Sequence, residues 1–91
     1  MCKPLFSLGR TVATPGALSA LEAGRVSAAT LLQRHHQGDW GELCAEDVEE
    51  NRRALAEGLR IFSSYCVGNG KVWIITEADR SATTVLLHED Y

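Results

Sequence analysis

The hydrophobic pattern of this chain changes its period once, near Gly58, and this change constrains the fold more than any other feature. Before Gly58, apolar residues recur three or four positions apart, as on one face of a helix. After it, β-branched and aromatic residues fill short runs between turn sequences, as in strands. A chain of 91 residues holds one domain with a modest core. The sequence therefore predicts a single α+β domain over residues 1–91, with helices preceding strands.

Three helices are predicted before Gly58, and each has a start and a stop signal. Thr14 followed by Pro15 is typical of a helix start, because the threonine oxygen caps a free N–H and proline already has the helical φ. Ser27 is the second cap. The third helix is predicted over about residues 45–57, where acidic residues in the first turn suit the helix dipole. The predicted stops are Gly24, Gly38 and Gly58.

The predicted strands are "RIFSSYCV", "KVWIITE" and "ATTVLL", joined by the turns "GNG" and "EADRS". Asn69-Gly70 is a strong hairpin signal. The stretch from Val72 to Thr76 is apolar on both alternations, which predicts a central strand. We therefore expect a three-stranded antiparallel meander with one face packed on the helices, in two layers. The earlier segment "LFSLGRTVA" is either an extended arm or an additional edge strand.

The charge is unevenly distributed. The net formal charge is −3, and residues 46–59 carry five acidic and two basic side chains. Such a chain lacks the basic surface of a nucleic-acid-binding protein, and its apolar runs are too short to span a membrane. Cys2, Cys44 and Cys66 are widely spaced and odd in number, with no secretion signal, so free thiols in a cytoplasmic protein are expected. The sequence has no CxxC pair or cofactor motif, and no metal or cofactor is predicted.

The stretch "QRHHQGDWGEL" has two interpretations. His35, His36 and Asp39, with Cys44, supply the groups for a metal site or for acid–base chemistry near neutral pH. Adjacent residues on a helix, however, point about 100° apart, so the two histidines cannot both face one ion. We favour the structural interpretation, in which His35 packs against the core and His36 is exposed near the helix C-terminus. Asp39 then caps the next turn, and Trp40 buries its ring.

The stretch "TEADRSATT" also has two interpretations. Arg80 and Glu77 are suited to an anion or phosphate site together with three hydroxyls, because arginine binds phosphate through a two-pronged fork. The hydroxyls are those of Ser81, Thr83 and Thr84. The favoured alternative is a turn followed by strand threonines, with Arg80 paired to Glu77 or Asp79. Arg80 is still the best single polar candidate, because a hairpin tip presents it to solvent.

Four further residues are assigned structural roles. Ser63 and Ser64 lie on a predicted strand and lack the nucleophile-elbow motif of hydrolases. Cys44 precedes an acidic helix, which opposes activation of its thiol. Asn51 falls on the predicted inner face of the third helix, where a buried amide needs hydrogen-bond partners and would tie the helix to a loop.

The segment "EDVEEN" carries the acidic residues Glu46, Asp47, Glu49 and Glu50. Its plain interpretation is a solvated helix face with a favourable dipole. Its functional interpretation is a surface that meets a basic patch on another protein. Together with Arg80, these four acidic residues are the predicted binding residues.

The motifs "LxxTVATPGAL", "RHxxGDWGEL" and "WIITEADRSxTTxLL", with the terminal "EDY", resemble a family of small bacterial proteins carried by plasmids and integrative elements. The resemblance extends over nearly the whole chain. It implies a cytoplasmic accessory protein of mobile DNA and implies no particular activity. Members of that family usually have proline where this chain has His88, so His88 is not assigned to a site.

Three functional hypotheses follow. The favoured one is a small non-enzymatic protein that binds another, unidentified protein and modulates host defence, replication or transfer. The second is a compact ribonuclease of the toxin type, in which His36, Lys71 and Arg80, with His35 and Arg60, converge on the sheet. The negative net charge disfavours RNA binding. The third is a structural homodimer joined through a sheet edge or an exposed apolar face.

Overall fold

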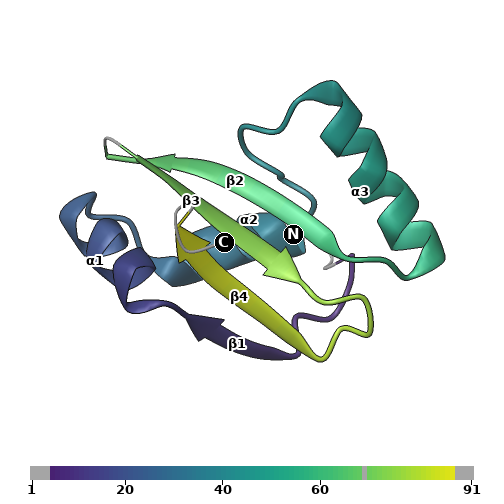
Figure 1. Cartoon of the computed structure of the whole chain (residues 1–91), viewed down its shortest axis with the longest axis horizontal. Coiled ribbons are helices and arrows are strands. Elements are labelled where there is room, and N and C mark those ends of the chain that lie inside the picture. The colour runs from purple at the N-terminus through teal and green to yellow at the C-terminus, as the bar shows by residue number, and fades with distance from the viewer. Residues whose placement is uncertain (1–4, 69, 88–91) are drawn as a thin grey trace.

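The computed structural model describes residues 5–68 and 70–87, which form three helices and a four-stranded mixed sheet (Figure 1). In chain order the elements are β1 (Arg10–Ala13), α1 (Pro15–Ala23), α2 (Ala28–His36), α3 (Ala45–Glu57), β2 (Ile61–Val67), β3 (Gly70–Thr76) and β4 (Ala82–Leu87). The predicted α+β class is confirmed. The residues Cys2, Asn69 and His88 and the terminal "EDY" lie outside the described ranges.

The helix boundaries follow the capping signals in the sequence. Thr14 is extended, with φ −74° and ψ 153°, and its hydroxyl accepts a hydrogen bond from the Ala17 N–H at 3.1 Å. Ser27 caps α2 in the same way through the Ala29 N–H, and α3 is followed by Gly58 in the left-handed conformation, with φ 68°. The predicted positions of the three helices are confirmed.

The sheet has the strand order β1-β4-β3-β2, so the predicted three-stranded meander is incomplete. The strands β2, β3 and β4 are antiparallel as predicted, and β3 lies between the other two. The additional strand β1 pairs with β4 in parallel, in the register Arg10↔Ala82 to Ala13↔Val85. The segment before the first helix is therefore an edge strand, and its direction makes the sheet mixed.

The pairing of β1 with β4 depends on a close approach that short-range patterns do not reveal. The Arg10 N–H donates to the carbonyl of Ser81 at 3.0 Å, and Ser81 lies just after the β3–β4 turn. Gly9 has φ 64°, and a Cβ at this position would collide with the carbonyl oxygen of Arg80. Glycine therefore allows the N-terminal segment to enter the sheet beside this turn.

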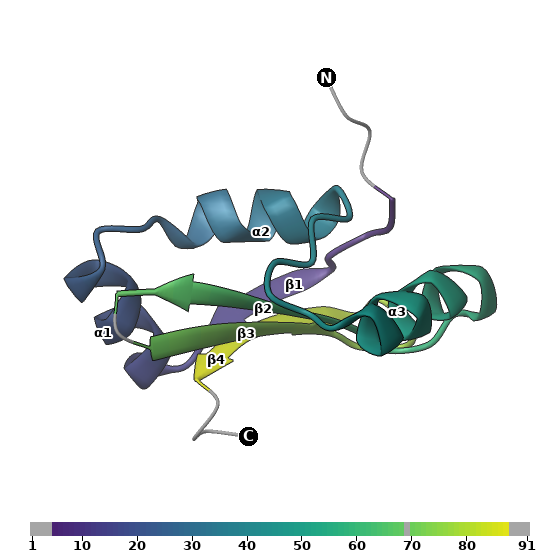
Figure 2. The ribbon, with the colours of Figure 1, turned by 90° about the horizontal axis from the view of Figure 1, so that it is seen from above.

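One face of the sheet carries the apolar core. Alternate residues of β2, β3 and β4 share this face and pack with residues of α1 and α2. The resulting cluster consists of Ala17, Leu21, Leu31, Tyr65, Val67, Val72, Ile74 and Val85. Figure 2 shows α2 lying over this face, whereas α3 lies beside β2 at the edge of the sheet. The expected packing of the helices on one face therefore describes α1 and α2 but is wrong for α3.

The outer edge of β2 is closed by contacts from α3 and from the segment that precedes it. The Asn51 side chain donates from Nδ2 to the Phe62 carbonyl at 2.6 Å and accepts from the Phe62 N–H at 3.1 Å, so it takes the place of a neighbouring strand. The Ser64 N–H donates to the Trp40 carbonyl at 3.2 Å, and the Ser64 carbonyl accepts from the Glu42 N–H at 2.6 Å. Asn51 thus ties the helix to a strand rather than to a loop, and the bonded edge is a poor template for another chain.

Candidate functional site

The paired histidines stand at the end of α2, where the chain turns sharply. The helix runs to His36, Gln37 caps its C-terminus, and Gly38 has φ 90°. Asp39 Oδ1 accepts a hydrogen bond from the Gly41 N–H at 3.2 Å, which forms the predicted turn. The interpretation of "QRHHQGDWGEL" as a helix end that turns a corner is confirmed.

His35 is fully buried beneath α2 and belongs to the core. Its Nδ1 is hydrogen-bonded to the Ser63 hydroxyl, and its Nε2 lies 2.9 Å from the Thr76 hydroxyl. Thr76 Oγ1 in turn lies 2.8 Å from Thr83 Oγ1, which donates to a main-chain carbonyl of the segment before β1 at 2.7 Å. Burial lowers the pKa of His35 to about 3, with repulsion from His36 as the smaller cause. The imidazole is therefore neutral near pH 7 and links a buried chain of hydroxyls.

Phe6 packs at the end of this hydrogen-bonded chain. Its ring makes an edge contact with His35, at 5.2 Å between centroids, and stacks on Trp40 at 6.2 Å. It also contacts His36 at 5.7 Å, so this second histidine is half-buried rather than exposed. Within residues 5–68 and 70–87, no group of three or more His, Cys, Asp or Glu side chains is placed to hold a metal ion.

The corner after α2 is fixed by an ion pair and a buried phenol. Arg34 Nε lies 2.8 Å from Asp39 Oδ2, and the hydrogen bond from Arg34 is the main cause that lowers the pKa of Asp39. The Tyr65 hydroxyl donates to the Asp39 carbonyl at 2.5 Å, and burial raises the pKa of Tyr65 to about 12. The Arg34 guanidinium also lies 4.6 Å from the centroid of the Tyr65 ring. Asp39 therefore has structural partners on both its side chain and its main chain.

Ser63 and Ser64 have structural partners as predicted. Ser63 and His35 are a hydroxyl and an imidazole in contact, the pair that a nucleophilic mechanism uses, but both side chains are fully buried. Ser64 contributes its main chain to the closed edge of β2. Cys44 precedes α3 without a side-chain cap hydrogen bond, and Cys44 and Cys66 are exposed free thiols.

Arg80 differs from both sequence interpretations. Its backbone is left-handed, with φ 61°, and its guanidinium donates to main-chain carbonyls instead of pairing with a carboxylate. These carbonyls belong to Leu59 at 2.6 Å, Glu77 and Ala54 at 3.1 Å, and Ala78 at 3.3 Å. Since Ala54 lies in the last turn of α3, the cation also stands at the negative end of that helix dipole. Arg80 is half-buried and joins α3 to the β3–β4 turn, so little of its donor capacity is left for an anion.

The residues of the nuclease hypothesis lie at two ends of the sheet. His36 and Arg80 flank the same ring, because the Arg80 guanidinium lies 5.7 Å from the Phe6 centroid. Lys71 is near the start of β3, five residues before Thr76 at the other end of the strand. At roughly 3.3 Å per residue, the two ends are about 16 Å apart. The Lys71 side chain also alternates to the face opposite the one that contacts His35. Lys71 is therefore far from the other two residues.

A pocket opens on that opposite face, between the sheet and the first turn of α3. It has a volume of about 330 Å³. Two aromatic rings in its wall, Phe62 and Trp73, meet edge to face at 4.7 Å between centroids, and both are half-buried. The complete lining is Glu42, Leu43, Asp47, Phe62, Ser64, Lys71 and Trp73. The pocket thus combines two aromatic rings with two carboxylates and one ammonium group.

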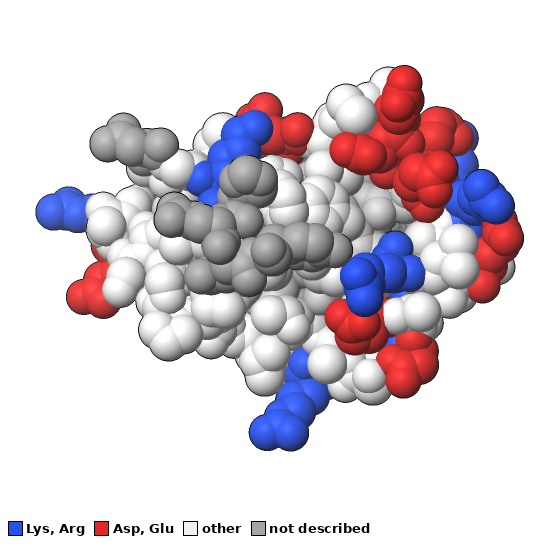
Figure 3. Space-filling view, in the orientation of Figure 1, with Lys and Arg blue, Asp and Glu red and all other residues white. Residues whose placement is uncertain are grey.

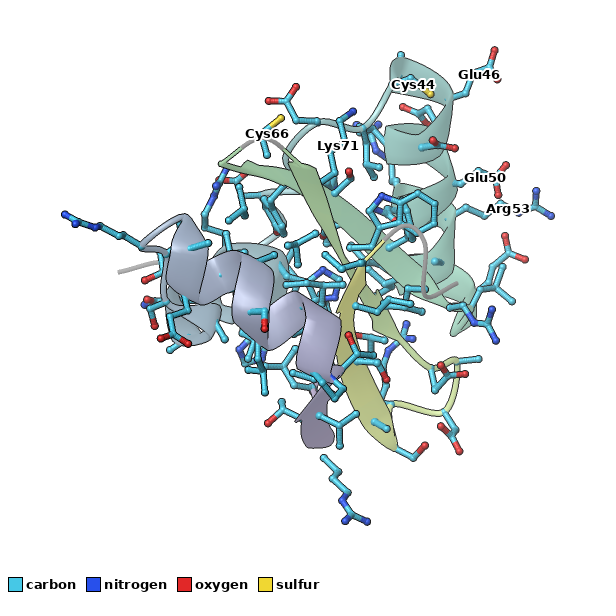
Figure 4. All side chains as sticks on the ribbon, turned by 60° about the vertical axis from the view of Figure 1, so that its left-hand side comes forward. Cys44, Glu46, Glu50, Arg53, Cys66 and Lys71 are labelled. Atoms are coloured by element: carbon cyan, nitrogen blue, oxygen red, sulfur yellow. The ribbon has the colours of Figure 1, made fainter. Side chains whose placement is uncertain are left out.

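Exposed carboxylates continue from the pocket along the outer side of α3. Figure 3 shows acidic side chains gathered over this helix, and Figure 4 shows Glu46 and Glu50 pointing outward from it. Among the residues that the structure describes, Glu46, Asp47 and Glu50 make no ion pair. Glu49 has one long contact, 3.6 Å, with Arg52 on the same helix. The four predicted acidic residues therefore form an exposed surface with a large excess of negative charge.

The acidic run predicted a binding surface that includes Asp47, but no sequence pattern placed aromatic rings beside it. Trp73 belongs to the strand that was predicted to be central, and the apolar run around it gave no sign that its side chain is only half-buried. One signal was available, because Lys71 and Trp73 are two positions apart and share a face. A lysine on a strand face indicates that this end of the face is open to solvent.

Comparison of the chain with protein-family models, with curated proteins and with solved structures finds no match. In the described part of the chain, no helix combines the length and the apolar character needed to cross a membrane. A function for this protein must therefore be inferred from its own surface.

Proposed function

We propose that this protein is a small non-enzymatic binding protein whose contact surface is the acidic side of α3 and the adjoining pocket. The observation that carries the proposal is that half-buried aromatic rings and exposed carboxylates line the same pocket. Protein interfaces are enriched in aromatic residues at their centres, and charged residues around them select the partner. The aromatic pair Phe62–Trp73 would be the centre of the contact and the α3 carboxylates its rim.

The charge of this surface determines the kind of partner. Glu46, Asp47, Glu49 and Glu50 present four carboxylates on successive turns of one helix. A basic patch on another protein would be attracted to them and would associate faster at low ionic strength. Such patches are common on proteins that handle nucleic acid. The partner is thus inferred to be a protein with an exposed basic segment.

The other polar clusters of the molecule support the fold in this proposal. The side chains of His35 and Arg80 already have hydrogen-bond partners on two or more sides. Arg80 was predicted as a binding residue, and here its role is to hold the C-terminal end of α3 against the sheet. The contact surface at the other end of α3 then has a fixed position relative to Trp73.

The setting that we propose is mobile DNA. The resemblance of three sequence motifs to proteins of plasmids and integrative elements favours an accessory protein that modulates host defence, replication or transfer. Basic proteins act in each of these processes, so an acidic binding surface has suitable targets there.

Charge reversal tests the proposed surface. Purified wild-type protein, Glu50→Lys and Glu22→Lys are used as baits in bacterial lysate, and retained proteins are compared. Glu22 lies on α1, is exposed, and undergoes the same change in charge. We expect a partner that is retained by wild type and Glu22→Lys and lost with Glu50→Lys. Identical retention by all three baits would contradict the assignment of the surface to α3.

Incubation with total bacterial RNA, first in EDTA and then in magnesium, tests the non-enzymatic assignment. We expect the RNA to stay intact in both buffers. Discrete cleavage that disappears in His36→Ala and Arg80→Ala variants, each shown to be folded by circular dichroism, would replace the proposal with the ribonuclease hypothesis.

A further inference from the structure

We propose that the pocket between the sheet and the first turn of α3 binds the guanidinium group of an arginine side chain presented by a basic segment of a partner protein. The inference rests on the proposed binding function and names the chemical group that the surface recognises. It follows from the size of the pocket, the nature of its walls and the sign of its charge.

The pocket has the dimensions for one long side chain. Its volume of about 330 Å³ is at the lower end of the range for ligand sites. It is open at the surface, because Glu42, Asp47 and Lys71 in its lining are all exposed. A side chain carried by another protein can therefore enter it without any movement of the sheet or of α3.

The aromatic wall favours a planar cation. Trp73 is half-buried and lines the pocket, so its indole forms part of the pocket wall. Trp is the aromatic side chain that attracts cations most strongly. A guanidinium is planar and weakly hydrated, and it stacks on aromatic rings more readily than the compact ammonium of lysine.

The two carboxylates reach the pocket from different parts of the chain. Glu42 belongs to the segment whose main chain bonds to β2, and Asp47 belongs to the first turn of α3. Both positions are therefore fixed by backbone hydrogen bonds of the fold. Arginine has five N–H donors in a rigid fork, so one guanidinium can reach two such acceptors while it covers the indole.

Lys71 is the positive group in the lining and would repel a cation. Its removal therefore distinguishes a cationic ligand from an anionic one. The lining carries two negative charges and one positive charge, and the exposed carboxylates of α3 lie outside it. If the ligand is cationic, removal of the Lys71 charge must strengthen binding. If the ligand is an anion held by Lys71 and the positive end of the α3 dipole, removal of that charge must abolish binding.

The experiment uses three blocked peptides: hexa-arginine, hexa-lysine and the neutral hexa-citrulline. Each is titrated into the whole ¹⁵N-labelled protein, and the indole N–H signals of Trp40 and Trp73 report on the two tryptophans separately. We expect hexa-arginine to bind about fivefold tighter than hexa-lysine, to shift the Trp73 signal and to leave Trp40 unaffected. Hexa-citrulline should not bind.

Matched variants locate the site. Asp47→Asn and Glu42→Gln are expected to weaken hexa-arginine binding by about five- to tenfold, and Lys71→Ala to strengthen it. Glu22→Gln removes the same charge on α1 and should leave the affinity unchanged. Equal binding of the arginine and lysine peptides without a Trp73 shift would overturn the proposal, as would weaker binding to Lys71→Ala. Loss of the lysate partner with Glu50→Lys would in that case still uphold the general binding function.

Discussion

The polar groups on the two faces of the sheet differ in burial and in hydrogen bonding. Beneath α2, His35 and the hydroxyls of Ser63, Thr76 and Thr83 are fully buried and bonded to one another. Beside α3, the carboxylates and the ammonium group around Trp73 are exposed, and no ion pair joins them within the described ranges. Buried polar groups stabilise only when every member has a partner, whereas exposed charges contribute little to stability. The polar groups of the first face therefore help to specify the fold, whereas the charges around Trp73 contribute little to it.

The largest effect is expected from substitution of His35. His35→Ala removes an imidazole that is fully buried and takes one hydrogen-bond partner from each of the Ser63 and Thr76 hydroxyls, so we expect a loss of about 3–5 kcal/mol in the free energy of unfolding. Urea denaturation of His36→Ala, the adjacent half-buried histidine, gives the control and should show a much smaller loss. Equal losses in the two variants would contradict the assignment of His35 to the bonded core.

Acidification is expected to lower the free energy of unfolding of the wild type through the same residue, His35. The pKa of His35 is about 3 in the folded protein and 6.5 without burial, so the unfolded chain binds one more proton between these values. The stability contributed by the neutral imidazole is complete above pH 6.5 and decreases as the pH falls, by about 1.4 kcal/mol per pH unit. Urea midpoints between pH 7 and about pH 4.5 measure this dependence before carboxylates with lowered pKa values begin to titrate. His36→Gln should retain the dependence, and a flat profile would show that His35 accepts a proton without penalty.

The next largest effect is expected from opening the closed edge of β2. Asn51→Ala leaves the Phe62 N–H and carbonyl without the side chain that replaces a neighbouring strand, and we expect a loss of about 2 kcal/mol. Asn51→Asp retains the acceptor but turns an anionic oxygen toward the Phe62 carbonyl, so it should be no better at neutral pH. Sedimentation velocity adds a second readout, because an opened edge favours self-association. A monomeric, fully stable Asn51→Ala variant would show that the edge needs no cover.

Arg80→Lys is expected to have a smaller effect. An ammonium group cannot span the four carbonyls that the guanidinium contacts, so we expect a loss of about 1–2 kcal/mol. Arg53→Lys changes an exposed arginine on α3 in the same way and should leave the thermal midpoint unchanged. If the two variants have the same thermal midpoint, the Arg80 contacts do not hold α3 to the sheet.

The sequence predicted what depends on local interactions. Thr14 and Ser27 cap their own helices, and left-handed Gly58 follows the end of α3, so these boundaries follow from a few neighbouring residues. The packing of His35 against the core followed from its place in the helical period, whereas the extent of its burial did not. The pairing of β1 with β4 does not follow in this way, because parallel strands are joined by long connections whose course a local pattern does not encode.

The candidate site was predicted only by its charge. The acidic run on α3 is a local feature, but its neighbours in space come from β2 and β3. Trp73 is only half-buried, and α3 lies at the sheet edge instead of covering this face. The contacts of Arg80 did not follow from the sequence for the same reason, since the carbonyl of Ala54, to which it donates, is 26 residues away in sequence.

The smallest effect on stability is expected on α3 itself. Glu46→Gln and Glu50→Gln remove exposed charges that have no ion-pair partner among the described residues, so each should change the free energy of unfolding by less than about 0.5 kcal/mol. The same substitutions should weaken partner binding, and the difference from wild type should shrink as salt is added, because exposed charges are screened. Calorimetric titration at two salt concentrations, beside urea denaturation, measures both quantities. A variant that lost stability and binding in proportion would mean that the α3 charges support the fold. Loss of binding alone would mean that they serve the contact with the partner and not the fold.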